Sequence, residues 1–217
     1  MRLKNATRWA ILAICYLFLS KTVATFFPEP FRNLAVARVT IVLSTLASIA
    51  VVYFYSSFYQ DYVRDEQTGL KNATMLAIIG TAAMALLHIK GLLLVFDAQV
   101  PRFLTKSHVF EVVVPWVSSI IGLVFFAVFC GETAGDRAAQ LKKAIRFAVI
   151  GSSIGVVERT FLLYRYLQGR DTISNGGLSP TLHFISLPII AMAVIAVLYF
   201  FVTFHRFQSI GESRSLR

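Results

Sequence analysis

Two adjacent charged residues, Glu158 and Arg159, lie inside an apolar stretch that runs from Leu141 to Tyr166. A charge at membrane depth costs about 2.5–3.5 kcal/mol on insertion scales, so such residues need a partner, a cavity or a ligand. A carboxylate is too short to reach the membrane surface from this depth, and Glu158 must be paired, hydrated or protonated. Arg159 lies about 100° further round the same helix. We therefore expect the partner of Glu158 on another helix, either Lys90 or His88.

Two interpretations of a Glu158–Lys90 pair stay open at this point. The pair is either a structural staple between two helices or part of a proton- or ligand-coupled site. Lys90 lies two residues from His88 and faces a different direction. Both side chains can therefore be internal only if their helix is central to the bundle.

Three basic residues, Lys21, His88 and Arg159, occupy the same position in three similar segments. Each lies eighteen residues after the leucine that opens LKNATRWAILA (3–13), LKNATMLAIIG (70–80) or LKKAIRFAVIG (141–151). If they converge in the outer half of the membrane they form a positive ring, and rings of basic side chains select anions. The alternative is that Lys21 and Arg159 extend to the interface while His88 packs neutrally between helices. The candidate ligand-binding residues are Lys21, His88, Lys90, Glu158 and Arg159.

A metal or haem site is the weaker alternative. The histidines that fall toward the outer side are accompanied by two carboxylates: His88, His108, His183, Asp97 and Glu111. No HxH, HxxxH or CxxC spacing is present, and the histidines are equally typical of a membrane interface. Cys15 and Cys130 lie far apart in apolar segments, which indicates buried, inert thiols. We expect no metal and no cofactor.

The composition indicates a polytopic membrane protein. The chain is 57% apolar and 15% charged, whereas soluble domains are about 45–50% apolar and about 25% charged. A formal charge of +10 would suggest nucleic acid as the partner of a soluble protein. Here the basic residues lie mostly at segment ends, where they orient helices and meet anionic lipid. The expected partner is therefore the lipid bilayer, and nucleic acid is excluded.

Six apolar stretches are long enough to span a membrane, for which about 20 residues are needed. They are Trp9–Phe27, Leu34–Tyr59, Ala73–Phe96, Phe110–Gly131, Ala144–Leu167 and Leu182–His205. The connections are short and hold no nucleophile motif, phosphate loop or dinucleotide pattern, so we do not expect an enzyme. Pro115 and Pro188 predict kinks that either fit the bundle or open a backbone site.

The basic residues predict the orientation. Twelve Lys and Arg residues lie near the helix ends on one side and seven on the other. The positive-inside rule then places both termini in the cytoplasm and the chain in the inner (plasma) membrane. Lys21 interrupts the first apolar run, which also begins a repeat. We therefore expect a retained helix rather than a cleaved signal peptide.

Internal similarity predicts three tandem two-helix hairpins within one transmembrane domain, residues 1–217. The repeat units are about 3–69, 70–140 and 141–217. After the second and fourth spans come FYQDYVRDEQTGLK and FCGETAGDRAAQLK, in which Phe, Asp and the final Leu-Lys fall in register at a spacing of 71. The even spans end in YFYSSFY, FFAVFC and YFFVTFHRF, which we interpret as an interfacial aromatic belt. Parallel repeats occur in transporters, and they also arise by duplication in structural subunits.

The sequence therefore predicts an all-α integral membrane protein with six transmembrane helices. The first functional hypothesis is a small transport or channel-like protein that binds an anionic or polar solute in the outer half of the bundle. The alternative is a non-catalytic structural subunit or sensory membrane domain of a larger complex. In either case the partners would be copies of the chain or other membrane subunits.

Overall fold

The computed structural model describes residues 2–27, 33–96, 108–133, 139–168 and 180–215. These residues form long helices: α1 (Arg2–Phe26), α2 (Leu34–Asp61), α3 (Thr68–Val95), α5 (His108–Glu132), α6 (Ala139–Leu167) and α7 (Pro180–Ser215). Six helices are long and apolar enough to cross a membrane. The predictions of an all-α chain and of six helices of membrane-spanning length are confirmed. The largest difference is at α7, which continues from the predicted end at His205 to Ser215.

Local signals set the two ends of α2. The Asn33 side chain accepts a hydrogen bond from the backbone N–H of Ala35 at 2.9 Å, which caps the start of the helix. At its other end, the Tyr62 N–H donates to the Phe58 carbonyl at 3.0 Å. A short turn then leads into α3, and a short connection of this kind makes consecutive helices antiparallel neighbours.

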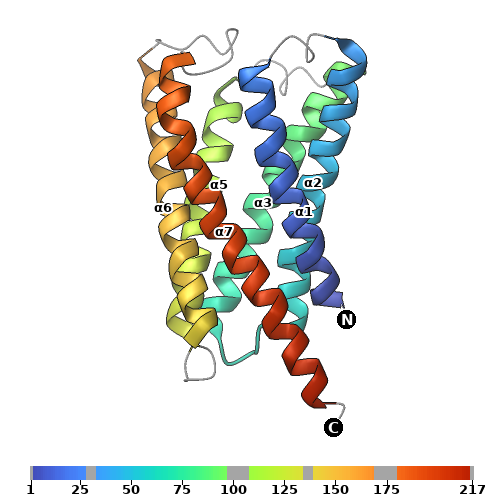
Figure 1. The fold of residues 1–217 in the computed structure, drawn as a ribbon, viewed down its shortest axis with the longest axis vertical. Helices are drawn as coiled ribbons and strands as arrows, with labels where there is room; N and C mark the ends of the chain where they lie inside the picture. Colours follow the sequence, from blue (N-terminus) through green and yellow to red (C-terminus); the bar gives the residue numbers. More distant parts are fainter. Residues whose placement is uncertain (1, 28–32, 97–107, 134–138, 169–179, 216–217) are drawn as a thin grey trace.

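The helices form a ring in chain order, and the last helix closes it. Each helix packs against its neighbour in the chain, and α7 packs against α1. The two ends of the chain lie at the same end of the bundle, which we call the terminal end (Figure 1); the opposite end is the distal end. At the terminal end, Arg8 Nε donates to His205 Nε2 at 3.3 Å, and Thr7 Oγ1 lies 3.4 Å from Gln208 Oε1.

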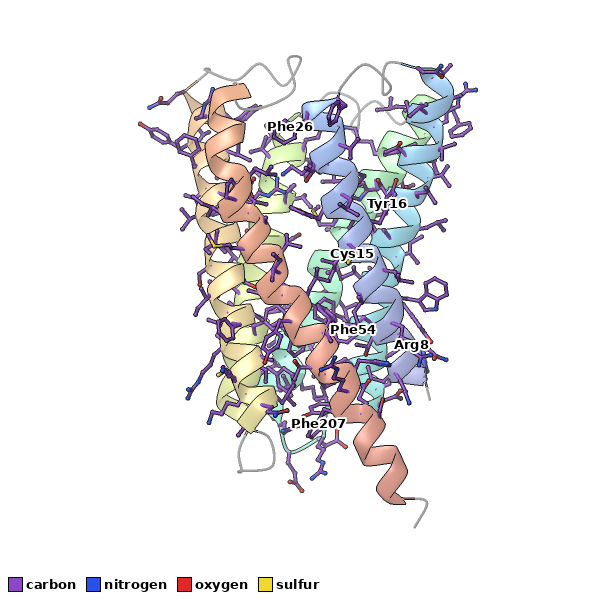
Figure 2. All side chains as sticks on the ribbon, viewed as in Figure 1. Arg8, Cys15, Tyr16, Phe26, Phe54 and Phe207 are labelled. Atoms are coloured by element: carbon purple, nitrogen blue, oxygen red, sulfur yellow. The ribbon has the colours of Figure 1, made fainter. Side chains whose placement is uncertain are left out.

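Aromatic side chains from α2, α5 and α7 fill the interior of the terminal half. These residues, which we call the aromatic core, are Phe54, Tyr55, Phe58, Phe125, Phe126, Phe129, Phe200, Phe201 and Phe204. The ring of Phe58 lies 5.4 Å from Phe125, 5.2 Å from Phe129 and 5.6 Å from Phe204. Such centroid distances are typical of favourable aromatic pairs. Figure 2 shows Phe54 in this part of the bundle.

The predicted interfacial belt is therefore wrong for these residues. Within each aromatic run the core residues are spaced i, i+1 and i+4, which places them on one face of a helix. That face points into the bundle, and Phe54, Phe58 and Phe204 have no exposed surface. Tyr53 and Tyr199, from the same runs, face outward and are exposed.

Small buried residues on α1, α3 and α6 let these helices pack closely around the aromatic core. The buried positions include Leu3, Ala6, Thr7 and Ala10 on α1, Leu70, Ala73, Thr74 and Ala77 on α3, and Leu141, Ala144, Ile145 and Ala148 on α6. Small side chains allow helix backbones to approach one another in membranes. The helices also approach closely at Gly151 of α6, where an added Cβ would lie 2.5 Å from the Ala193 carbonyl oxygen of α7.

The two prolines lie inside α5 and α7, and both helices continue through them. Pro115 is buried, whereas Pro188 is exposed. Neighbouring helices and local adjustments satisfy backbone groups freed by proline in membrane helices. Neither proline lies among the residues that line the pocket described next.

Candidate functional site: a charged pocket between α1, α5, α6 and α7

Glu158 of α6 pairs with Lys21 of α1. The Lys21 Nζ lies 3.5 Å from Glu158 Oε1, and the Glu158 side chain is only 16% exposed. The prediction that Lys90 or His88 would be this partner is wrong. Similar depth along the sequence does not fix the direction in which a side chain points, and the ring closure brings α1, not α3, to Glu158.

Lys90 instead pairs with Glu111, its counterpart on the next helix. The Lys90 Nζ donates to Glu111 Oε1 at 2.8 Å, and the Lys90 side chain is buried, with 6% exposed. Lys90 lies shortly before the end of α3, and Glu111 lies in the first turn of α5. A hairpin places these two positions at the same depth, so this contact could have been inferred from the sequence.

His88 is held by a hydrogen bond to α2. Its Nδ1 lies 2.8 Å from Ser48 Oγ, and the Ser48 hydroxyl also donates to the Ser44 carbonyl at 3.0 Å. A hydroxyl has one hydrogen, so when it donates to Ser44 the His88 Nδ1–H is the donor to Ser48. His88 is thus placed between helices, as the alternative to the three-cation ring expects for this residue alone. Of the ring residues, only Lys21 and Arg159 line the pocket.

The pocket has a volume of about 370 Å³ and lies between α1, α5, α6 and α7. Its polar lining consists of Lys21, Ser119, Ser152, Glu158 and Arg159. The apolar walls from α1 and α7 include Ile14, Leu17, Phe18, Ile190, Val194 and Val197. Small-molecule sites typically have volumes of about 300–1,000 Å³, mostly apolar walls and a few polar groups. The pocket fits that description.

The pocket carries a net positive charge. Lys21 and Arg159 contribute two positive charges and Glu158 one negative charge, which leaves one positive charge. Within the described part of the chain, no hydrogen bond or ion pair engages the guanidinium of Arg159. A charged group in an apolar environment is stabilised by a counter-ion. An anion in the pocket would supply one.

Neighbouring helices are also joined near the pocket. Trp116 Nε1 donates to Thr160 Oγ1 at 3.0 Å, next to Arg159 in the chain. Ser118 Oγ donates to the Gly80 carbonyl at 2.9 Å. These hydrogen bonds hold α5 against α6 and against α3, and they fix the wall that carries Ser119. Ser119 and Ser152 were not predicted as pocket residues, because serines are common in membrane helices, where they often serve helix packing.

The described residues contain no group of three or more His, Cys, Asp and Glu side chains placed to hold a metal ion. Asp97 lies outside the described residues, as do the side chains of His108 and His183. Cys15 and Cys130 are free thiols, each partly buried. The contact that the structure shows among Lys21, Glu158 and Arg159 is the Lys21–Glu158 ion pair.

Comparisons with protein-family models, with curated proteins and with solved structures find no match to this chain. The function is therefore inferred from the geometry and the charge of the pocket.

Proposed function

We propose that this chain is a small integral-membrane transport or channel-like protein whose pocket binds an anionic or polar solute. The observation that carries the proposal is Arg159, which lines the pocket beside the Lys21–Glu158 pair and has no ion pair among the described residues. A guanidinium presents N–H donors in a fork that matches a carboxylate or a phosphate.

The candidate residues then take different roles. Arg159 is the main contact of the solute. Glu158 holds the Lys21 ammonium, and an arriving anion competes with Glu158 for that ammonium. His88 and Lys90 act indirectly in this proposal: they fix α3 through Ser48 and Glu111, away from the pocket.

The aromatic core bears on the kind of transport that we propose. Its rings are buried and close the bundle interior at the terminal half, and the pocket lining does not include them. A solute bound at Arg159 therefore reaches the terminal end only if α2, α5 and α7 rearrange. This supports a gated carrier more than an open pore.

The test is anion flux into liposomes that contain the purified protein. Chloride, acetate and phosphate serve as probes, each applied as a gradient. We expect Arg159→Gln to lower the flux of the transported anion at least about tenfold, which corresponds to about 1.4 kcal/mol of lost interaction. Arg146→Gln is the matched control, since Arg146 is an exposed arginine of the same helix outside the pocket. Equal flux through both variants and the unchanged protein would contradict the proposal.

A second candidate is a structural or sensory subunit of a larger complex. It is favoured by α7, which at 36 residues is the longest helix and projects past the bundle at the terminal end (Figure 1). A projecting helix is suited to contact a second copy or a partner subunit. Deleting residues 210–217 discriminates the two functions, because it should dissociate the complex under this candidate and leave anion flux unchanged under the first.

The repeat and the orientation are part of the proposal. Three tandem hairpins are supported by the burial of Leu3, Leu70 and Leu141 at equivalent positions. An orientation with both termini in the cytoplasm, in the inner membrane, is supported by the Lys and Arg distribution and by the common end at which the termini lie (Figure 1).

A further inference from the structure

We infer that the pocket takes a single-chain amphiphile from the surrounding membrane: an anionic carboxylate or phosphate headgroup with a hydrocarbon tail. This inference rests on the proposed anion-binding function and specifies its ligand class. Its basis is the separation of charged and apolar surfaces within one pocket.

The charged groups lie at one end of the pocket. Lys21 is near the distal end of α1, which finishes at Phe26, and Ile14 and Leu17 lie nearer the middle of that helix. On α6, Glu158 and Arg159 likewise follow the wall residues that begin at Gly151. A bound amphiphile therefore has its headgroup toward the distal end and its tail toward the middle of the bundle. A lipid in the distal leaflet has the same orientation, so the ligand can move from the membrane without turning over.

The apolar part of the pocket disfavours a small hydrated anion. Water in a protein cavity needs about 2–4 polar partners. The walls formed by Ile14, Leu17, Val194 and Val197 offer aliphatic side chains instead. A small anion at Arg159 would leave these walls facing unpartnered water or empty space. A hydrocarbon tail fills the same space and removes apolar surface from water, which is the favourable outcome.

The headgroup end supplies charge complementarity. The lining has one unbalanced positive charge, and Arg159 is its cation without an ion pair among the described residues. An uncharged amphiphile would leave Arg159 without a counter-ion, so the charge is part of the recognition.

Two glycines in the lining allow the pocket to be tested directly by substitution. An added Cβ at Gly122 on α5 or at Gly155 on α6 meets no atom within 4 Å, and both glycines line the pocket. The Cβ of a leucine at either position therefore has open space, and we expect the rest of its side chain to occupy part of the pocket. Gly131 is the matched control, because an added Cβ there also meets no atom, but Gly131 is outside the pocket lining.

The experiment measures displacement of dansyl-undecanoate fluorescence from the full-length protein in nanodiscs, with empty nanodiscs subtracted. Dodecanoate, dodecanol, butyrate and inorganic phosphate are the competitors. We expect dodecanoate to compete best, since each buried methylene contributes about fourfold in affinity. Gly122→Leu and Gly155→Leu should each weaken probe binding at least about tenfold, and Gly131→Leu should leave it unchanged. Arg159→Gln should lower the affinity for dodecanoate without lowering the affinity for dodecanol.

Each alternative result has a defined meaning. If butyrate or phosphate competes as well as dodecanoate, and Arg159→Gln loses probe binding, the ligand is an anion without a required hydrocarbon tail. That result overturns the amphiphile and keeps the proposed anion-binding function. Dodecanol competing as well as dodecanoate overturns the anionic headgroup. Probe binding that survives both leucine substitutions places the ligand elsewhere and overturns the inference. If one leucine variant fails to fold, the other variant and Arg159→Gln decide the question.

Discussion

The ammonium of Lys21 lies 3.5 Å from the carboxylate of Glu158, although most of the chain separates the two residues. The contact forms because α7 packs against α1 and closes the ring. Two helices that are not consecutive in the ring thus share an ion pair across the pocket. The pair also neutralises Lys21, so Arg159 accounts for the net charge of the pocket.

Removing the charge of Glu158 should destabilise the protein, because Lys21 and Arg159 then lie together without compensation. The Lys21 side chain is 50% exposed, so we expect Glu158→Gln to cost about 1–3 kcal/mol, between exposed and buried pairs. Thermal unfolding in detergent measures the loss. Glu158→Gln with Lys21→Met should recover most of it, whereas Glu158→Gln with Lys90→Met should not. Recovery by the Lys90 change would contradict the observed pairing.

Removing the charge of Glu111 should lower the free energy of unfolding more than removing the charge of Lys90. Glu111→Gln leaves the buried Lys90 ammonium without its carboxylate, and we expect a loss of about 3 kcal/mol. Lys90→Met removes the buried charge itself and should cost less. The double variant should melt near the unchanged protein. Since Lys90 is outside the pocket lining, none of these variants should change dansyl-undecanoate affinity; a tenfold change would show that the two sites are linked.

Truncating the aromatic core should destabilise the bundle to a similar extent at three equivalent positions. Phe58→Ala, Phe129→Ala and Phe204→Ala each leave a cavity among buried rings. We expect about 3 kcal/mol for each, the lower end of the soluble range, because lipid solvates apolar groups in the unfolded state. Tyr53→Ala is the control, since Tyr53 is exposed. Unfolding in detergent checks the values, and one large and two negligible effects would argue against a threefold repeat.

Close packing of α6 against α7 should make Gly151 intolerant of a side chain. A Cβ there would lie 2.5 Å from the Ala193 carbonyl oxygen, and a backbone atom cannot move aside as a side chain can. We expect Gly151→Ala to cost about 1–3 kcal/mol, as other overpacking substitutions do. Gly155→Ala, where the added Cβ meets open space, should be close to neutral apart from its effect on helix propensity. Equal melting temperatures for the two variants would refute the close approach.

The proposed orientation places both chain ends in the cytoplasm. A reporter that is active only in the periplasm should be inactive when fused after Arg217, and a cytoplasm-active reporter should be active there. Mass spectrometry of the purified protein should recover peptides from α1, because we expect that helix to be retained. A truncated product that lacks α1 would contradict both the predicted topology and the threefold repeat.

The sequence by itself determined the number of helices and their length, because apolar runs of membrane-spanning length leave little choice of backbone structure. An even number of spans also places both termini at one end, as observed (Figure 1). Glu158 and Arg159 stood out for the cost of burying a charge. Even the inward face of the aromatic core was present in the i, i+1, i+4 spacing, although the runs were interpreted as a belt.

Tertiary structure alone decided which charged residues meet. Sequence position gives the depth of a side chain along its helix, but rotation about the helix axis and the order of helices around the ring decide its partner. Lys90 and His88 were the predicted partners of Glu158, but the contact of α7 with α1 brings Lys21 to it instead. The rotation of α3 about its own axis likewise decides that His88 faces Ser48 of α2 and not the pocket. The pocket itself exists only because four separate helices surround it, which no local pattern encodes.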